Sequence, residues 1–277
     1  MVRLLLSGTK GYLGACVLAE ALTRGMEVRT LEGRLEGIVP GSLEVEAVIH
    51  CAGALRSRAT EFDRSNRVGT AALLAGIGNS AAFIQVSSRG VYAPSEASFL
   101  DEESPLGPVD GYGTSKLAAE ELVRASGLPF VIFRATALWG WGMGDGGSAF
   151  PSAATAAFAQ GRPVQLHCPD RLVDYLHVRS FATLLLDALA PGLHWGRVIN
   201  AAGSPRSLHN LIRNLGARME AQGRNVTLRE TAGPPARAPL LATGLLHTLF
   251  PKWEQPGDGY LLDELVRETL GGPLGTS

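Results

Sequence analysis

The feature that most restricts the fold is a set of three glycines between an apolar segment and a helical pattern. Residues 2–7 form a short apolar run that predicts a buried strand. Gly8, Gly11 and Gly14 follow, and the apolar spacing then predicts a helix through Leu22. In this context the first glycine permits a tight turn, the second lets backbone N–H groups approach a pyrophosphate, and the third lets helix and strand pack closely. A purely structural glycine-rich turn is the alternative.

Composition and charge exclude several classes of partner. The chain has 277 residues and a net charge of -1, so it can bury a large core and offers no basic stripe for nucleic acid or an anionic membrane. The first apolar run is too short for a membrane span or a secretion signal. Cys16, Cys51 and Cys168 are far apart, which argues against a metal cluster or disulfides. We therefore expect a cytoplasmic protein that uses no metal.

Strand-like and helix-like segments alternate along the first half of the chain. Strands are predicted at 27–31, 45–51, 81–86, 130–134 and 198–200, and helices at 63–75, 112–125, 149–160, 207–221 and 263–270, with a strand end and a helix at 174–190. This alternation predicts an α/β fold with a doubly wound parallel sheet and helices on both faces. We expect a nucleotide-binding domain over 1–135, returning at about 175–200, and a smaller C-terminal lobe from 136–174 and 201–277 that binds substrate. Residues 33–43 are too few for a further helix and strand.

Two charged residues after the second predicted strand bear on cofactor choice. Glu32 ends that strand, where an acid accepts hydrogen bonds from a ribose diol and repels a 2'-phosphate. Arg34 argues for the 2'-phosphate instead. The balance leans slightly to NAD(H) over NADP(H), and a solvated loop carboxylate is the other interpretation of Glu32.

Tyr112 and Lys116 lie four residues apart in a predicted helix, so they share one face. An unperturbed tyrosine titrates near ~10 and is a poor acid or base at neutral pH; a shift to about 7 takes roughly 4 kcal/mol, which a nearby cation helps to supply. Such a pair by itself is also common on ordinary surface helices. His50 lies inside a buried strand and is interpreted as a core residue with satisfied hydrogen bonds.

Further motifs in order along the chain give the pair its context. They lie at 48–53, 66–70, 86–92, 133–134, 138–140, 174–178 and 200–203. Together with the glycines and the Tyr-Lys pair, they make the chain resemble an extended short-chain dehydrogenase/reductase, the NAD-dependent epimerase/dehydratase family. The resemblance implies a Rossmann sheet and hydride transfer between a nicotinamide and a hydroxyl or carbonyl group.

The resemblance also assigns roles to residues. It makes Ser88, Tyr112 and Lys116 catalytic: Tyr112 as general acid/base, Ser88 as a hydrogen-bond donor to the same substrate oxygen, and Lys116 also as a ligand of the nicotinamide ribose. The residues expected to contact NAD(H) or NADP(H) are Gly8, Lys10, Gly11, Tyr12, Leu13, Gly14, Glu32, Arg34, Cys51, Ala52, Gly53, Asn66, Val86, Tyr112, Lys116, Ala135 and Leu138. Relatives pair two helices per subunit, so a homodimer through 63–75 and 112–125 is expected.

Departures from the family pattern restrict the activity. Arg89 follows Ser88 where dehydratases carry an acid, so a 4,6-dehydratase is not expected. Val173 stands where sugar-nucleotide enzymes often have a diphosphate-binding arginine; Arg171 and Arg237 are possible replacements. Fewer fixed phosphate contacts favour an enzyme that releases its cofactor each turnover.

We therefore expect a nucleotide-sugar ketoreductase. The alternatives are a nucleotide-sugar 4-epimerase and a reductase of a non-sugar carbonyl compound. A non-catalytic NAD(P) sensor is a third possibility, against which the presence of Ser88, Tyr112 and Lys116 argues.

Overall fold

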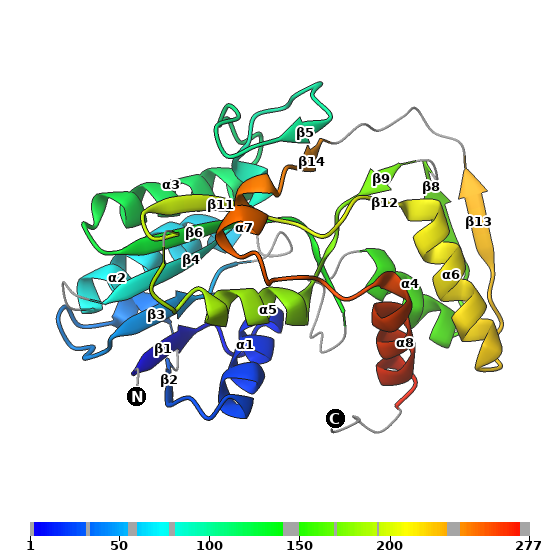
Figure 1. Cartoon of the computed structure of the whole chain (residues 1–277), viewed down its shortest axis with the longest axis horizontal. Helices are drawn as coiled ribbons and strands as arrows, with labels where there is room; N and C mark the ends of the chain where they lie inside the picture. Colours follow the sequence, from blue (N-terminus) through cyan, green and yellow to red (C-terminus); the bar gives the residue numbers. More distant parts are fainter. Residues whose placement is uncertain are drawn as a thin grey trace.

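A six-stranded parallel sheet forms the centre of one half of the molecule (Figure 1). The computed structural model describes residues 3–31, 34–54, 60–77, 81–140, 150–168, 171–192, 194–231 and 239–271. The strands, from edge to edge, are β2 (Val28–Thr30), β1 (Leu4–Ser7), β3 (Ala47–His50), β4 (Ala82–Ser88), β6 (Phe130–Ala135) and β11 (Arg197–Ala201). All neighbouring pairs are parallel. The prediction of a doubly wound parallel sheet is confirmed.

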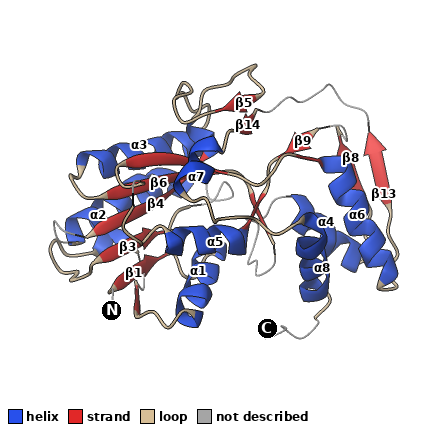
Figure 2. Cartoon of the chain, in the orientation of Figure 1, coloured by secondary structure: helices blue, strands red, loops and turns tan. Residues whose placement is uncertain are grey.

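Helices cover both faces of this sheet (Figure 2). One face carries α1 (Tyr12–Thr23) and α5 (Val178–Asp187); the other carries α2 (Gly69–Gly76), which continues a π-helix at Asp63–Val68, and α3 (Gly111–Ala125). Side chains alternate between the faces of a strand, so Leu4 and Leu6 pack with α1 and α5, whereas Leu5 packs with α2 and α3. Burial on both faces explains why these strands read as continuous apolar runs.

The short connection between β2 and β3 contains one 3-10 helix, η1 (Leu35–Gly37), among its described residues. The expectation that this segment lacks a full helix and strand is confirmed there, and β2 is the edge of the sheet. The chain leaves β1 toward β2 on one side and reaches β3 on the other. This reversal is the switch point at which open parallel sheets bind ligands, beyond the carboxyl ends of the strands.

A second group of elements has a core of its own (Figure 1). It comprises α4 (Phe150–Ala159), α6 (Leu208–Ala221), α8 (Asp258–Thr269), β8 (Val164–His167) and β13 (Leu228–Thr231), with Phe158, Leu215 and Leu265 buried among them. Helix α8 begins at Asp258, earlier than the predicted 263.

One part of the predicted C-terminal lobe belongs elsewhere. Helix α7 (Gly244–Leu249) lies against β11, and Leu246, Phe250 and Trp253 join the core beneath α1 and α5. This stretch of the predicted lobe at 201–277 thus packs on the sheet, where its apolar side chains fill the sheet's own core, and the division into domains stays a prediction.

Three pairs of two-residue strands connect distant parts of the chain. They are β5 (Phe99–Leu100) with β14 (Leu240–Leu241), β7 (Leu138–Trp139) with β10 (Leu176–His177), and β9 (Leu172–Val173) with β12 (Arg206–Ser207). Strands this short leave no periodic pattern to detect in a sequence. Within the described ranges, no helix is both long and apolar enough to cross a membrane.

Candidate functional site

The glycine turn brings the ends of two strands and one helix into contact. Gly8 has φ +79°, and a Cβ there would lie 2.5 Å from the Ala52 nitrogen at the end of β3. A Cβ on Gly14 would lie 2.1 Å from the Gly8 carbonyl oxygen. The first position needs a left-handed backbone and the third needs a missing side chain, so both glycines meet requirements that no other residue meets.

Helix α1 begins directly at this turn with its N-terminus uncapped. Its N-cap, Gly11, offers no side chain, and the first turn contains no acidic residue. The Gly11 N–H donates to the Gly8 carbonyl at 2.9 Å. The next N–H groups, from Tyr12 to Gly14, have no acceptor within the helix. Leu13 buries its side chain in the core, so only its backbone is available. These N–H groups and the positive helix end suit an anionic group such as a pyrophosphate.

The end of β3 lies beside Lys116. A Cβ on Gly53 would be 2.7 Å from Asn66 Oδ1 and 3.1 Å from Lys116 Nζ. Lys116 is 5% exposed as a residue, and its ammonium donates to the Val86 carbonyl at 3.0 Å. Four sequence-predicted residues, Gly53, Asn66, Val86 and Lys116, are thus brought together at the carboxyl edge of the sheet.

Asn66 joins three of the surrounding elements. Its Oδ1 accepts from the Ala54 N–H at 3.0 Å, and its Nδ2 donates to Ser115 Oγ at 2.8 Å. The Ser115 hydroxyl in turn donates to the Tyr112 carbonyl at 2.8 Å. Asn66 lies in the π-helical stretch, a distortion often found at functional sites. Its bonds fix the first turn of α3 relative to the end of β3.

The segments that follow Ser88 and that carry Tyr112 pack backbone against backbone. Ser88 ends β4 and accepts from the Gly90 N–H at 3.1 Å, which starts the 3-10 helix η4 (Arg89–Val91). A Cβ on Gly113 would lie 2.1 Å from the Gly90 carbonyl oxygen, so α3 touches η4 next to Tyr112. The Tyr112 ring packs edge-on against Phe62, with centroids 5.6 Å apart. Asp110 caps this helix by accepting from the Gly113 N–H at 2.8 Å.

His50 belongs to the core, as its position predicted. It is fully buried between Ser7 Oγ, 2.6 Å from Nδ1, and Thr70 Oγ1, 2.9 Å from Nε2. Because the Thr70 hydroxyl donates to the Asn66 carbonyl at 2.5 Å, it accepts from Nε2–H, and Nδ1 accepts from Ser7. Burial, with a smaller contribution from the Lys116 charge, lowers the pKa of His50 to about 3. It is therefore neutral and structural.

The neighbouring Cys51 is also inert. Burial raises the pKa of its thiol to about 12, against the opposing charge of Lys116. It is a small side chain at the strand end, not a nucleophile. The described residues include no group of three His, Cys, Asp or Glu that could hold a metal ion.

The remaining predicted cofactor contacts are spread around the edge. Ala135 ends β6 and Leu138 begins β7, both packed against the core beneath α1 and α5. Lys10 is exposed, and Arg34 lies 3.8 Å from Glu36 and 3.9 Å from Glu61 at the surface. Glu32 lies outside the described residues.

Asp174 makes long-range contacts that the sequence did not predict. It is 2% exposed and accepts from the Leu241 N–H at 2.8 Å and from Arg89 Nη1 at 3.5 Å. Arg89 also donates to the Pro239 carbonyl. Burial raises the pKa of Asp174, while Leu241 and Arg89 act in the opposite sense. The residue after Ser88 is therefore tied to a segment 150 positions away.

The diphosphate candidates differ in their surroundings. Val173 is buried, and the Nε of Arg171 is buried with no hydrogen-bond partner in the part of the chain that the structure describes. Arg237 lies outside the described residues. Arg206, not anticipated from the sequence, pairs with Asp258 and lies over the Trp139 ring at 6.0 Å. A half-buried arginine next to a helix N-cap has no local sequence signal.

Comparison with known proteins finds relatives over part of the chain. Two relatives are each 31% identical: a 4-hydroxy-2-methyl-3-oxo-4-farnesyl-3,4-dihydroquinoline-1-oxide ketoreductase of Stigmatella aurantiaca over 171 residues, and a UDP-glucose 4-epimerase of Azospirillum brasilense over 169. The matches cover 50% and 48% of this chain and 51% and 48% of the relatives, so the chain spans about half the length of the curated relatives it matches.

Likeness in fold extends over the whole chain. The structure of RMD from Pseudomonas aeruginosa, complexed with NADPH, superposes with a TM-score of 0.80 at 24% identity, covering 98% of both chains. The family model described as "NAD dependent epimerase/dehydratase family" matches residues 4–202, which include the glycine turn, Ser88, Tyr112 and Lys116. By this match, over well more than half of its length, the chain belongs to the NAD-dependent epimerase/dehydratase family.

Proposed function

We propose that the protein is an NAD(P)-dependent oxidoreductase that reduces the ketone of a nucleotide-linked sugar. One observation supports this most strongly. Lys116 is held at the Val86 carbonyl beside Gly53 and Asn66, one helical turn from Tyr112, where β4 delivers Ser88. Family membership makes this edge of the sheet the expected place for hydride chemistry.

The residues present fit a nicotinamide dinucleotide. Gly8 and Gly53 let the ends of β1 and β3 pack closely at this edge, because a Cβ at either position would collide with neighbouring protein atoms. The uncapped, acid-free start of α1 offers N–H groups to the pyrophosphate of such a cofactor. Lys116 would hold the nicotinamide ribose. When bound, such a cofactor supplies or accepts a hydride.

In the proposed reaction, the protein's own side chains manage the proton. Tyr112 donates its phenolic proton to the carbonyl oxygen as that oxygen becomes an alcohol, and the Lys116 ammonium stabilises the phenolate that remains. Ser88 donates a hydrogen bond to the same oxygen and orients the ketone. The hydride at carbon and the proton at oxygen together give the alcohol, so the step is balanced, and solvent reprotonates Tyr112.

Replacing Tyr112 tests these roles. Tyr112→Phe removes the proton donor and keeps the ring, so we expect at least ~100-fold loss of rate with cofactor affinity retained. Lys116→Ala should reduce both rate and affinity. Steady-state kinetics and cofactor titration by intrinsic fluorescence measure the two effects. Near-full activity in Tyr112→Phe would remove it from the mechanism.

The two relatives each favour one alternative. The Azospirillum brasilense relative is named a 4-epimerase, and the Stigmatella aurantiaca relative is named a ketoreductase of a quinoline oxide, which is not a sugar. An epimerase must keep its cofactor through oxidation and reduction, whereas a reductase exchanges it each turnover. Cofactor retention therefore separates the epimerase from both reductases.

The first experiment is to denature freshly purified protein and assay the released nucleotides. An empty site, or loss of cofactor on dilution, supports a ketoreductase. A near-stoichiometric yield of NAD would overturn it in favour of the epimerase. Any sugar nucleotide released with the cofactor identifies the substrate class. Turnover of a non-sugar ketone with no response to nucleotide sugars would support the reductase of a non-sugar carbonyl compound.

A further inference from the structure

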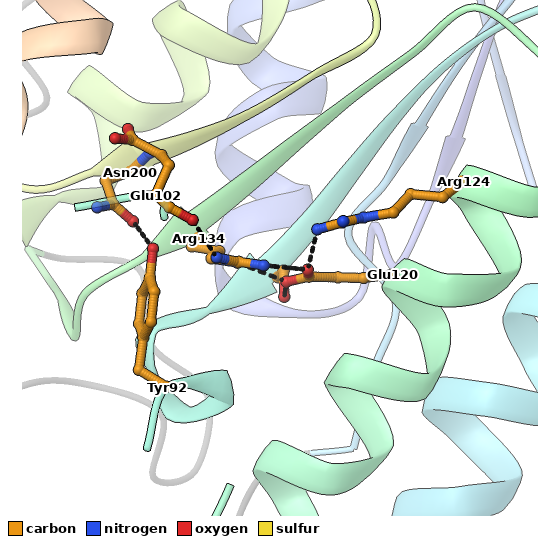
Figure 3. A network of polar contacts seen from close by, with 7 residues as sticks. Tyr92, Glu102, Glu120, Arg124, Arg134 and Asn200 are labelled. Carbon is orange, nitrogen blue, oxygen red and sulfur yellow. Dashed lines mark hydrogen bonds and ion pairs between the residues drawn. The ribbon is translucent and has the colours of Figure 1, made fainter. Parts of the chain in front are cut away.

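A buried polar network lies between α3 and the sheet, at the end of β4 (Figure 3). At its centre the Glu120 carboxylate is wholly buried. It accepts from Ser87 Oγ at 2.5 Å, from Arg134 Nη2 at 2.8 Å and from Arg124 Nη2 at 3.3 Å. Glu120 on α3 thus forms hydrogen bonds both to the end of β4 and to β6.

The Arg134 guanidinium extends this network across the sheet. It is 1% exposed, donates to the Glu102 carbonyl at 3.3 Å and lies over the Tyr92 ring at 4.8 Å (Figure 3). The Tyr92 hydroxyl donates to Asn200 Oδ1 at 2.7 Å, and the Asn200 N–H donates to the Glu102 carboxylate at 2.8 Å. Arg134 is therefore fixed from both sides and holds Glu120 with two of its nitrogens.

The spacing along α3 connects this network to the proposed catalytic residues. Tyr112, Lys116 and Glu120 occur at intervals of four, so they lie on one face in successive turns. Lys116 is bonded to the carbonyl of Val86, and Glu120 to the hydroxyl of Ser87. Two successive turns of the helix thus bind two successive residues of the strand, immediately before Ser88. Any slide of α3 along β4 would break both bonds.

A buried ion pair gives little net stability compared with an apolar pair of the same shape, because both charges lose their hydration. The contact of two Arg134 nitrogens with the Glu120 carboxylate fixes the orientation of that carboxylate. Reaction rates are sensitive to displacements of about 1 Å in groups that must meet one substrate atom. The carboxylate held in this way accepts the hydrogen bond of Ser87, the residue directly before Ser88.

We propose that Ser87 and Glu120, with Arg134 holding the carboxylate, are positioning residues that align Ser88 with Tyr112 and Lys116. This inference rests on the proposed function, since it presupposes that Ser88 and Tyr112 act on one substrate oxygen. In this role the three residues act without touching substrate or cofactor. They fix the position of α3 along β4.

Ser87→Ala is the test, because it removes one hydroxyl from a buried strand and leaves the ion pair intact. We expect kcat to fall on the order of tenfold, while KM and the dissociation constant for NAD(H) change less than about twofold. Ser87→Thr retains a hydroxyl and should restore most of kcat. Hydrogen–deuterium exchange of the amides at 86–91 should be faster in Ser87→Ala than in the wild type. In Ser87→Thr it should be close to the wild-type rate.

Two controls separate positioning from general loosening of α3. Ser126→Ala removes a hydroxyl that donates to the Val123 carbonyl at the end of the same helix, and Arg124→Gln removes the exposed partner of Glu120. Both should leave kcat and the exchange at 86–91 unchanged. Unchanged kcat in Ser87→Ala, or unchanged exchange over 86–91, would overturn the inference. So would an equal decline of kcat and cofactor affinity together with a lower melting temperature.

Tyr112→Phe, measured alongside, distinguishes the two levels of the argument. If Tyr112→Phe is inactive and Ser87→Ala is fully active, only the positioning role fails. If Tyr112→Phe keeps its activity, the proposed function fails, and the exchange measurement alone then decides whether Ser87 fixes the end of β4.

Discussion

Gly14 provides the sharpest test of how closely α1 approaches β1. A Cβ at this position would lie 2.1 Å from the Gly8 oxygen and 2.5 Å from the Gly8 carbon. Carbon and oxygen normally meet at about 3.3 Å or more. Gly14→Ala must therefore push α1 away by about 1 Å, and the obstacle is backbone, which cannot rotate aside as a side chain would.

The expected cost follows from two opposing effects. Overpacking a tight contact costs about 1–3 kcal/mol, and the backbone obstacle places Gly14 at the upper end. Alanine regains about 1 kcal/mol of helix propensity over glycine. The net loss of about 2 kcal/mol corresponds to a melting temperature lower by about 6 °C for a chain of this size. Retreat of the helix N-terminus should also weaken NAD(H) binding about tenfold, equivalent to about 1.4 kcal/mol.

Thermal unfolding followed by circular dichroism and fluorescence titration with NAD(H) measure these two quantities. Gly244→Ala is the matched control, because Gly244 begins α7 and a Cβ there meets nothing within 4 Å. It should leave NAD(H) affinity unchanged and should not lower the melting temperature, because only the gain in helix propensity remains. A Gly14→Ala protein with wild-type melting temperature and affinity would refute the close approach. A lower melting temperature with unchanged affinity would refute the role of α1 in binding the pyrophosphate.

Three further predictions concern cofactor choice, pH and assembly. We expect modestly tighter binding of NAD(H) than of NADP(H), since Glu32 opposes a 2'-phosphate and the charge of Arg34 is shared with nearby acids; fluorescence titration showing tighter NADP(H) binding would contradict this. Burial lowers the pKa of His50 to about 3, so between about 6.5 and 3 the unfolded chain binds a proton that the folded chain does not. Stability should therefore fall as the pH falls through this window, by up to about 1.4 kcal/mol per unit. The free energy of unfolding, measured with urea at several pH values in this range, should depend less steeply on pH in His50→Asn than in the wild type. An equal pH dependence in the two proteins would disprove the assignment. We also expect a homodimer through α2 and α3, which light scattering showing only monomer at micromolar concentration would exclude.

The sequence by itself determined the parts of this protein that depend on local chemistry. The apolar runs predicted the parallel sheet, and the glycine spacing predicted the turn that begins α1. The four-residue interval between Tyr112 and Lys116 predicted that both lie on one face of a helix. Each of these signals lies within a few residues of the structure that it predicts. The placing of Ser88 and Lys116 in one site followed from the family resemblance, not from a local pattern.

Only the tertiary structure decided which distant residues meet. Arg134 was a motif residue near a strand end, and no sequence pattern marked Glu120 as its counter-ion. Nor did any pattern mark Ser87 as a hydrogen-bond donor to Glu120. Asp174 reaches Leu241 across 67 positions, and α7 returns to the sheet from within the predicted second lobe. A polar side chain has the same local pattern whether it is solvated or buried with a partner. Its role is decided when folding removes water from it and a distant group must replace the lost hydrogen bonds.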